Sequence, residues 1–68
     1  MVGYVARDAN GSLWFHGSAP ENNDNFKAWM SDEFMEIKDE EFPEFKNLCY
    51  RDEPIKVELT IKKYDNTL

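Results

Sequence analysis

The 68-residue chain has few of the residues that build covalent or metal-based frameworks, with one cysteine, Cys49, and one histidine, His16. A single cysteine excludes a disulfide within the chain and is typical of proteins that do not depend on oxidation. The usual zinc site needs three or four nitrogen and sulfur ligands, which one cysteine and one histidine do not supply. We therefore predict no metal and no cofactor, and we expect Cys49 to be a small buried thiol.

Long apolar runs and basic residues are also scarce. No stretch of about eighteen apolar residues occurs, and the N-terminus has no basic segment followed by an apolar run, so we expect a soluble, cytoplasmic protein without membrane contact. The net charge is −6, and the segment 32–53 carries all of this excess, with nine acidic and three basic residues. Direct nucleic-acid binding is not expected, because a phosphate backbone attracts a basic surface.

Motifs that define catalytic or ligand sites are missing as well. The three glycines are scattered and form no phosphate-binding loop. Four acidic residues lie close together without the spacing of a calcium loop, and we interpret them as a solvated acidic face: Asp39, Glu40, Glu41 and Glu44. Tyr4 and His16 offer an acid–base couple, but a histidine packed beside aromatic residues explains His16 more simply, and we expect no enzyme activity.

The clearest pattern in the chain is the alternation of apolar and polar residues over 55–62. Ile55, Val57, Leu59 and Ile61 fall on one face of an extended chain, and three of these four are β-branched. We predict a C-terminal strand here with that face turned toward the core, followed by a frayed tail at 64–68.

The N-terminal residues predict a β-hairpin. The sequence Asp8-Ala9-Asn10-Gly11 fits a type I turn followed by a left-handed glycine, which is a three-residue hairpin loop with a bulge. This turn pairs Arg7 with Leu13, Ala6 with Trp14, Val5 with Phe15 and Tyr4 with His16. One face then carries Val5, Leu13 and Phe15, and the other carries Tyr4, Ala6, Trp14 and His16. Because both faces are partly apolar, the hairpin is either central or exposes one apolar face.

The middle of the chain is less clearly patterned. Residues 17–25 have the composition of a loop. Residues 26–37 fit helical spacing, but we favour a short element at 26–30 and a strand at about 33–38. We expect a helical turn at 39–42, capped by Asp39 and ended by Pro43, then a short strand at 47–50. Phe42 and Phe45 are expected to fill the core.

Several short segments resemble a group of small proteins without an assigned activity from gut bacterial and phage genomes. The segments are Tyr4-Val5-Ala6-Arg7-Asp8 with Asn10-Gly11, Met35-Glu36-Ile37, Phe42-Pro43-Glu44 and Asp52-Glu53-Pro54-Ile55-Lys56-Val57-Glu58-Leu59. They cover about a third of the chain, and the resemblance favours the strand over the helix at 34–37. It implies no functional residues.

Together these patterns predict a single domain over residues 1–68 that is α+β and mostly β, with a small antiparallel sheet and a short helical turn. Tyr4, Trp14, His16 and Trp29 are the candidate protein-interaction residues, because exposed tryptophan is enriched at interfaces. We expect a non-enzymatic protein that binds another protein or itself, as a homodimer. The alternative is an acidic mimic of nucleic acid that occupies the basic groove of a DNA- or RNA-binding protein.

Overall fold

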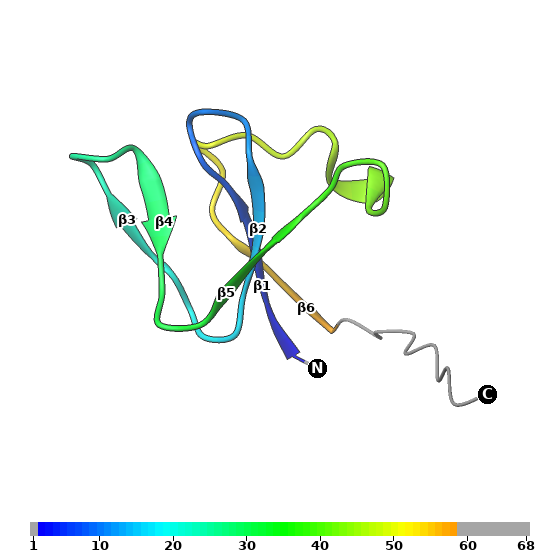
Figure 1. The fold of residues 1–68 in the computed structure, drawn as a ribbon, viewed down its shortest axis with the longest axis horizontal. Coiled ribbons are helices and arrows are strands. Elements are labelled where there is room, and N and C mark those ends of the chain that lie inside the picture. Colours follow the sequence, from blue (N-terminus) through cyan, green and yellow to red (C-terminus); the bar gives the residue numbers. More distant parts are fainter. Residues whose placement is uncertain (1, 59–68) are drawn as a thin grey trace.

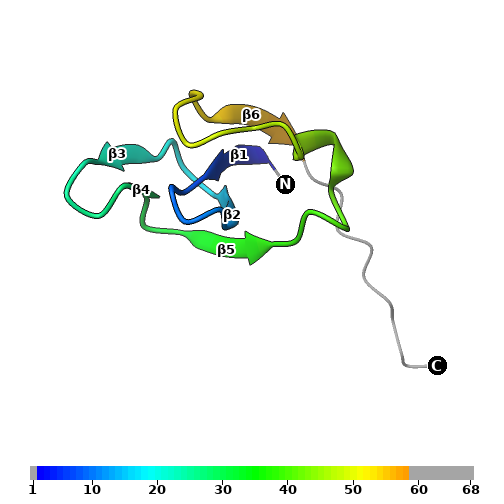
Figure 2. The ribbon, with the colours of Figure 1, turned by 90° about the horizontal axis from the view of Figure 1, so that it is seen from above.

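Four antiparallel strands form the central sheet of the computed structural model, which describes residues 2–58 (Figure 1). The strand order across the sheet is β5-β2-β1-β6, and Figure 2 shows the strands in this sequence from one edge to the other. The bounds are β1 Val2–Arg7, β2 Leu13–His16, β5 Phe34–Ile37 and β6 Ile55–Glu58. The predicted mostly-β fold is confirmed. Within residues 2–58 the only helical element is one 3-10 turn.

The N-terminal hairpin has the predicted register at all four pairs, from Tyr4 opposite His16 to Arg7 opposite Leu13. The Gly11 N–H donates to the Asp8 carbonyl at 2.9 Å, and Gly11 has a positive φ of 96°. Glycine adopts this φ without the steric cost that a Cβ adds. The turn residues therefore set the register of the two central strands.

A second, two-stranded sheet projects from one side of the central sheet (Figure 1). It consists of β3, Glu21–Asn23, and β4, Ala28–Met30, and we call it the arm. The short element expected near 26–30 is thus strand β4, whereas the loop predicted at 17–25 is wrong in part, because it contains β3. The polar sequence of β3 has no alternation to reveal it, and its pairing with β4 depends on backbone hydrogen bonds.

One face of the central sheet forms the core. Its buried side chains are Val5, Leu13, Phe15, Ile37, Phe45 and Leu48, with Phe42 and Val57 partly buried against them. Phe42 and Phe45 fill the core as predicted. They belong to the segment between β5 and β6, which crosses the core face of the sheet.

The turn predicted before Pro43 is present, because the Glu41 and Phe42 N–H groups both donate to the Lys38 carbonyl, at 3.0 and 3.1 Å. The helical element itself begins at Pro43, which the sequence did not predict. The 3-10 helix η1 spans Pro43–Phe45 and has no side-chain cap. Proline suits the first turn of a helix, because its φ is already helical and it has no N–H to leave unpaired. Asp39 does not cap a helix, since its carboxylate binds Arg7.

Arg7 joins this crossing segment to the hairpin. Its Nε donates to the Leu48 carbonyl at 2.6 Å, and one terminal nitrogen donates to the Phe45 carbonyl at 2.9 Å and to Asp39 at 2.8 Å. The other terminal nitrogen donates to the Gly11 carbonyl at 2.8 Å and to Asp39 at 3.2 Å. The hydrogen bond from Arg7 lowers the pKa of Asp39. We call this arrangement the arginine clamp.

The segment 47–50 is a series of turns, so the predicted strand there is wrong. The Cys49 N–H donates to the Asp52 carboxylate at 2.8 Å, and the Leu48 carbonyl accepts from Arg7. Side chains thus bind the backbone groups that a strand would place in a ladder. Cys49 is exposed, contrary to the expected buried thiol.

The C-terminal strand is confirmed over Ile55–Glu58, where it pairs with β1. Ile55 lies opposite Val5 and Val57 opposite Gly3, which places both on the core face as expected. Ile55 is nevertheless 41% exposed, because β6 is an edge strand with a neighbour on one side only. The remainder of the predicted strand, with Leu59 and Ile61, and the tail at 64–68 lie outside the described residues.

Candidate functional site

The second face of the hairpin is partly covered, and the cover leaves a pocket. On this face Ala6 and His16 are buried, whereas Tyr4 and Trp14 are half-buried. The pocket has a volume of about 160 Å³. It lies where β2 and the start of β5 meet the arm and the hairpin turn, and its lining residues are Asp8, Trp14, His16, Trp29, Met30, Ser31 and Phe34. We call it the tryptophan pocket.

The arm that forms one wall of the pocket is held by a few specific hydrogen bonds. The Trp29 backbone N–H donates to Asp8 Oδ1 at 3.0 Å, and the Ala9 N–H donates to the Lys27 carbonyl at 3.0 Å. The Trp29 indole N–H donates to the Tyr50 carbonyl at 3.3 Å, and the two rings meet edge to face with centroids 6.5 Å apart. These contacts tie the arm to the hairpin turn and to the crossing segment.

Trp14 and Phe34 form the opposite, aromatic wall. Their ring centroids lie 5.7 Å apart in an edge-to-face arrangement, which is a favourable geometry for two aromatic rings. The Trp14 indole N–H donates to Ser12 Oγ at 2.8 Å, so its polar atom is satisfied by the turn. Phe34 is 61% exposed and Met30 is 48% exposed. The pocket therefore has an apolar rim that faces solvent.

His16 is the buried polar residue of the pocket, with 1% of its surface exposed. Its Nδ1 lies 2.7 Å from Ser31 Oγ, and Ser31 Oγ donates to the Glu33 carbonyl at 2.7 Å. A hydroxyl has one proton, so Ser31 accepts a hydrogen bond from His16 Nδ1–H, and Nε2 carries the lone pair.

The Nε2 atom is buried and has no hydrogen-bond partner among residues 2–58. An unpaired buried acceptor costs about 1–3 kcal/mol. Burial lowers the pKa of His16 below 6.5, and the nearby Asp8 carboxylate opposes this shift. The imidazole is thus neutral at pH 7 and offers an acceptor.

The hydrogen bonds of Asp8 and His16 also show whether the two side chains form an acid–base pair. Asp8 and His16 line one pocket, but within the described residues no hydrogen bond joins them, and Asp8 Oδ1 is engaged by the Trp29 N–H. Tyr4 is opposite His16 in the hairpin but does not line the pocket. Proton transfer needs an oriented donor and acceptor pair, and within residues 2–58 neither Asp8 nor Tyr4 forms one with His16 through a direct hydrogen bond.

The structure brings three of the four predicted interaction residues together. Trp14, His16 and Trp29 line the tryptophan pocket, and Tyr4 lies outside it on the same sheet face. His16 is buried rather than on the surface, and both tryptophans are half-buried. Sequence reasoning missed Asp8, Met30, Ser31 and Phe34. The signal for Phe34 was present, because strand alternation at 34–37 places it on the face of Trp14 and His16.

The predicted acidic face lies on the segment that follows the last residue of β5, whereas Phe34 of the pocket rim is the first residue of that strand. Asp39, Glu40, Glu41 and Glu44 are all exposed, and Asp39 is paired with Arg7. Within residues 2–58 no three histidine, cysteine, aspartate or glutamate side chains are placed so that they could hold a metal ion.

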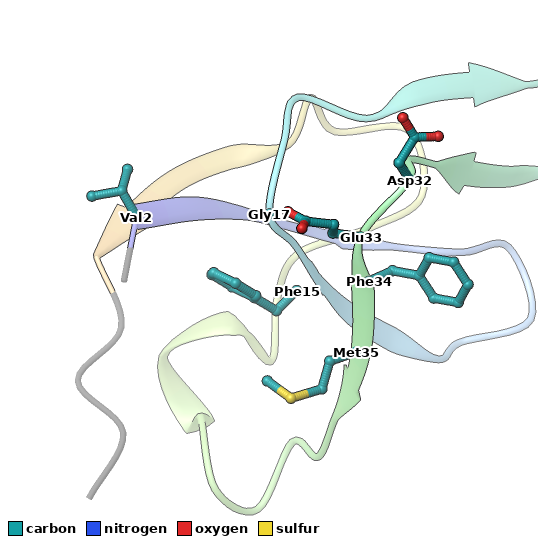
Figure 3. Close-up of a pocket in the computed structure, with 7 residues that line it drawn as sticks. All are labelled: Val2, Phe15, Gly17, Asp32, Glu33, Phe34 and Met35. Atoms are coloured by element: carbon teal, nitrogen blue, oxygen red, sulfur yellow. The ribbon is translucent and has the colours of Figure 1, made fainter.

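A second hollow of about 580 Å³ lies at the end of the sheet (Figure 3). Figure 3 shows Phe15 and Met35 pointing to one side of β5, whereas Phe34 points to the other. The acidic residues of this hollow, Asp32 and Glu33, are exposed. It contains no buried polar group of the kind that His16 provides, so the tryptophan pocket is the better candidate site.

Comparison with protein families, curated proteins and solved structures finds no match to this chain. The resemblance to short proteins of gut bacterial and phage genomes stays a prediction. In the part of the chain that the structure describes, no helix has the length and hydropathy that a membrane crossing requires.

Proposed function

We propose that this chain is a small non-enzymatic protein-binding module that takes a side chain of a basic partner segment into the tryptophan pocket. The observation that carries this proposal is the rim of the pocket, where Phe34 and Met30 are 61% and 48% exposed beside two half-buried tryptophans. Aromatic and methionine side chains are enriched in the anchoring centres of protein interfaces.

The net charge of the chain favours one of the two partners expected from the sequence, which are another protein and a second copy of this chain. A net charge of −6 makes two copies repel each other, whereas it attracts a basic segment. Around the pocket the carboxylate of Asp8 lines the wall, and Glu36 lies opposite Trp14 on the same sheet face. A basic partner is therefore favoured over a second copy.

The edge of the sheet offers a place for such a segment. Strand β5 pairs with β2 on one side, and within residues 2–58 no strand pairs with its other side. An extended segment along this edge forms backbone hydrogen bonds, while pockets beside the edge select its side chains. Phe34, the first residue of β5, lies at both this edge and the pocket.

The test is selection of binding peptides from a random displayed library against the full chain. We expect the enriched peptides to contain lysine or arginine and to lose about tenfold in affinity for Phe34→Ser. Met35→Ser is the matched control, since Met35 is the next residue and is also exposed, but points to the opposite face. Peptides that bind both variants equally well, or acidic peptides, would contradict the proposal.

A further inference from the structure

We propose that the tryptophan pocket accepts the primary ammonium group of a lysine side chain, held between the aromatic walls by the Asp8 carboxylate and His16 Nε2. This inference rests on the proposed function, because it names the partner residue that enters the pocket. The partner is thus identified by chemistry, as a segment with an exposed lysine.

The first reason is the combination of aromatic rings with a carboxylate. Trp14, Trp29 and Phe34 line the same pocket as Asp8. A cation within about 6 Å of an aromatic ring is attracted by the negative charge density of the ring face, most strongly for tryptophan. A carboxylate on the same wall adds a direct charge attraction.

The second reason is that both polar groups have free acceptor capacity. Asp8 Oδ1 accepts from the Trp29 N–H, and Oδ2 has no hydrogen-bond partner within residues 2–58. His16 Nε2 is a buried lone pair that is also without a partner in that part of the chain. The buried Nε2 requires a donor, Asp8 Oδ2 can accept a further one, and an ammonium group has three N–H donors and no acceptor.

The third reason is that the histidine does not repel a cation. The Nδ1–H is engaged with Ser31 Oγ at 2.7 Å, and burial keeps the ring neutral at pH 7. A neutral imidazole with its lone pair on Nε2 favours a ligand with N–H groups over a quaternary ammonium, which has none. Because Nε2 is buried, the ligand reaches it only if lining side chains move, and Met30 and Phe34 are the exposed apolar side chains of the lining.

The pocket has room for this group. Its volume of about 160 Å³ is well above the roughly 10–15 Å³ that a cavity needs to hold one water. Four methylene groups and one nitrogen make up the lysine side chain. Butylammonium contains these atoms without the backbone and is therefore the simplest probe of the pocket.

The experiment titrates the full chain with butylammonium, 1-butanol and tetramethylammonium at constant ionic strength, and follows the indole N–H signals of Trp14 and Trp29 by NMR. We expect butylammonium to bind with a dissociation constant in the low millimolar range and the other two to bind about threefold to tenfold more weakly. Butanol that binds as tightly would reduce the site to an apolar pocket and overturn the inference. Tetramethylammonium that binds as tightly would overturn the role of Nε2 as acceptor, and so would the absence of any binding.

Asp8→Asn is the variant that removes the negative charge with the least other change. Asparagine retains an oxygen that accepts from the Trp29 N–H, and it suits the turn. We expect about a tenfold loss of butylammonium binding with unchanged butanol binding. Asp32→Asn is the control, since Asp32 is an exposed acid that does not line this pocket. If the selected peptides lose affinity for Phe34→Ser but butylammonium does not bind, the lysine inference fails while the proposed function stands. If the selected peptides bind Phe34→Ser as tightly as the wild type, the proposed function fails.

Discussion

The two faces of the central sheet use the same strands and the same alternation of side chains, yet only one of them is closed. On the core face, Val5, Leu13 and Phe15 are covered by Phe45 and Leu48 of the crossing segment, and all five are at most 8% exposed. On the opposite face, Ala6 and His16 are buried, but Trp14 is half-buried and Phe34 is 61% exposed.

The difference lies in what covers each face. The crossing segment brings two apolar side chains to the core, and the arginine clamp holds it by the carbonyls of Phe45 and Leu48. The arm contributes Trp29 and Met30 and is held at its backbone by Asp8 and the hairpin turn. A face that is covered at one end by a narrow arm leaves a pocket, and the side chains at its rim are too exposed to contribute to stability as the core residues do.

The largest expected effect is the loss of stability when a side chain is truncated on the core face compared with the pocket face. Leu13 is 2% exposed in the core, so Leu13→Ala should lower the free energy of unfolding by about 3 kcal/mol. Phe34→Ala removes a larger side chain from the pocket face, but we expect a loss of less than about 1 kcal/mol because Phe34 is mostly exposed. Urea denaturation of both variants measures this. Equal losses would show that the pocket face is part of the stabilising core.

The arginine clamp gives the next largest effect. Arg7→Met retains the apolar part of the side chain but loses the hydrogen bonds to Leu48, Phe45 and Asp39, and we expect a loss of about 2 kcal/mol. Arg7→Lys retains the charge but not the planar group that reaches several acceptors, so it should recover less than half of this loss.

The control for the clamp is Arg51→Met, at an exposed arginine on the same crossing segment. Thermal unfolding of the three variants at one pH and one salt concentration compares them. An Arg7→Lys variant as stable as the wild type would mean that charge alone holds the crossing segment.

The sequence predicted the parts of the fold that depend on local patterns. The turn from Asp8 to Gly11 determines the register of β1 and β2, and the alternation at 55–58 identifies β6. The segment that forms β5 also fits helical spacing, and the strand was the favoured prediction there. These elements follow from turn chemistry and period, which are visible in a single sequence.

The parts that were missed depend on contacts between distant residues. The strand expected at 47–50 is absent because Arg7 and Asp52 bind its backbone groups, and β3 exists through its pairing with β4. Trp14 and Trp29 were candidate residues, but nothing local to either shows that the arm brings them to one pocket. The turn motif explains Asp8 locally, but nothing in the motif shows that the Asp8 carboxylate also accepts a hydrogen bond from the Trp29 N–H.

The smallest expected effect concerns pH and tests whether the pocket face includes a buried neutral histidine. Burial lowers the pKa of His16 in the folded chain below the value of about 6.5 that applies when the chain is unfolded. Below about pH 6.5 the unfolded chain therefore binds more protons than the folded chain, so the free energy of unfolding decreases as pH falls toward the folded pKa. Above about pH 6.5 both states are neutral at this residue, and the contribution of His16 is fully present.

The measurement is chemical unfolding at several pH values between about 7.5 and 5, with His16→Asn as the comparison. Asparagine places an amide N–H near the position of Nδ1–H, so it retains the hydrogen bond to Ser31 but does not titrate. The free energy of unfolding of the wild type should decrease more steeply on acidification than that of the variant. The carboxylate of Asp39 does not interfere, because Arg7 lowers its pKa and it titrates below this pH range. Parallel curves for the two proteins would mean that His16 has the same pKa folded and unfolded, and the pocket would then contain a hydrated imidazole in place of a buried acceptor.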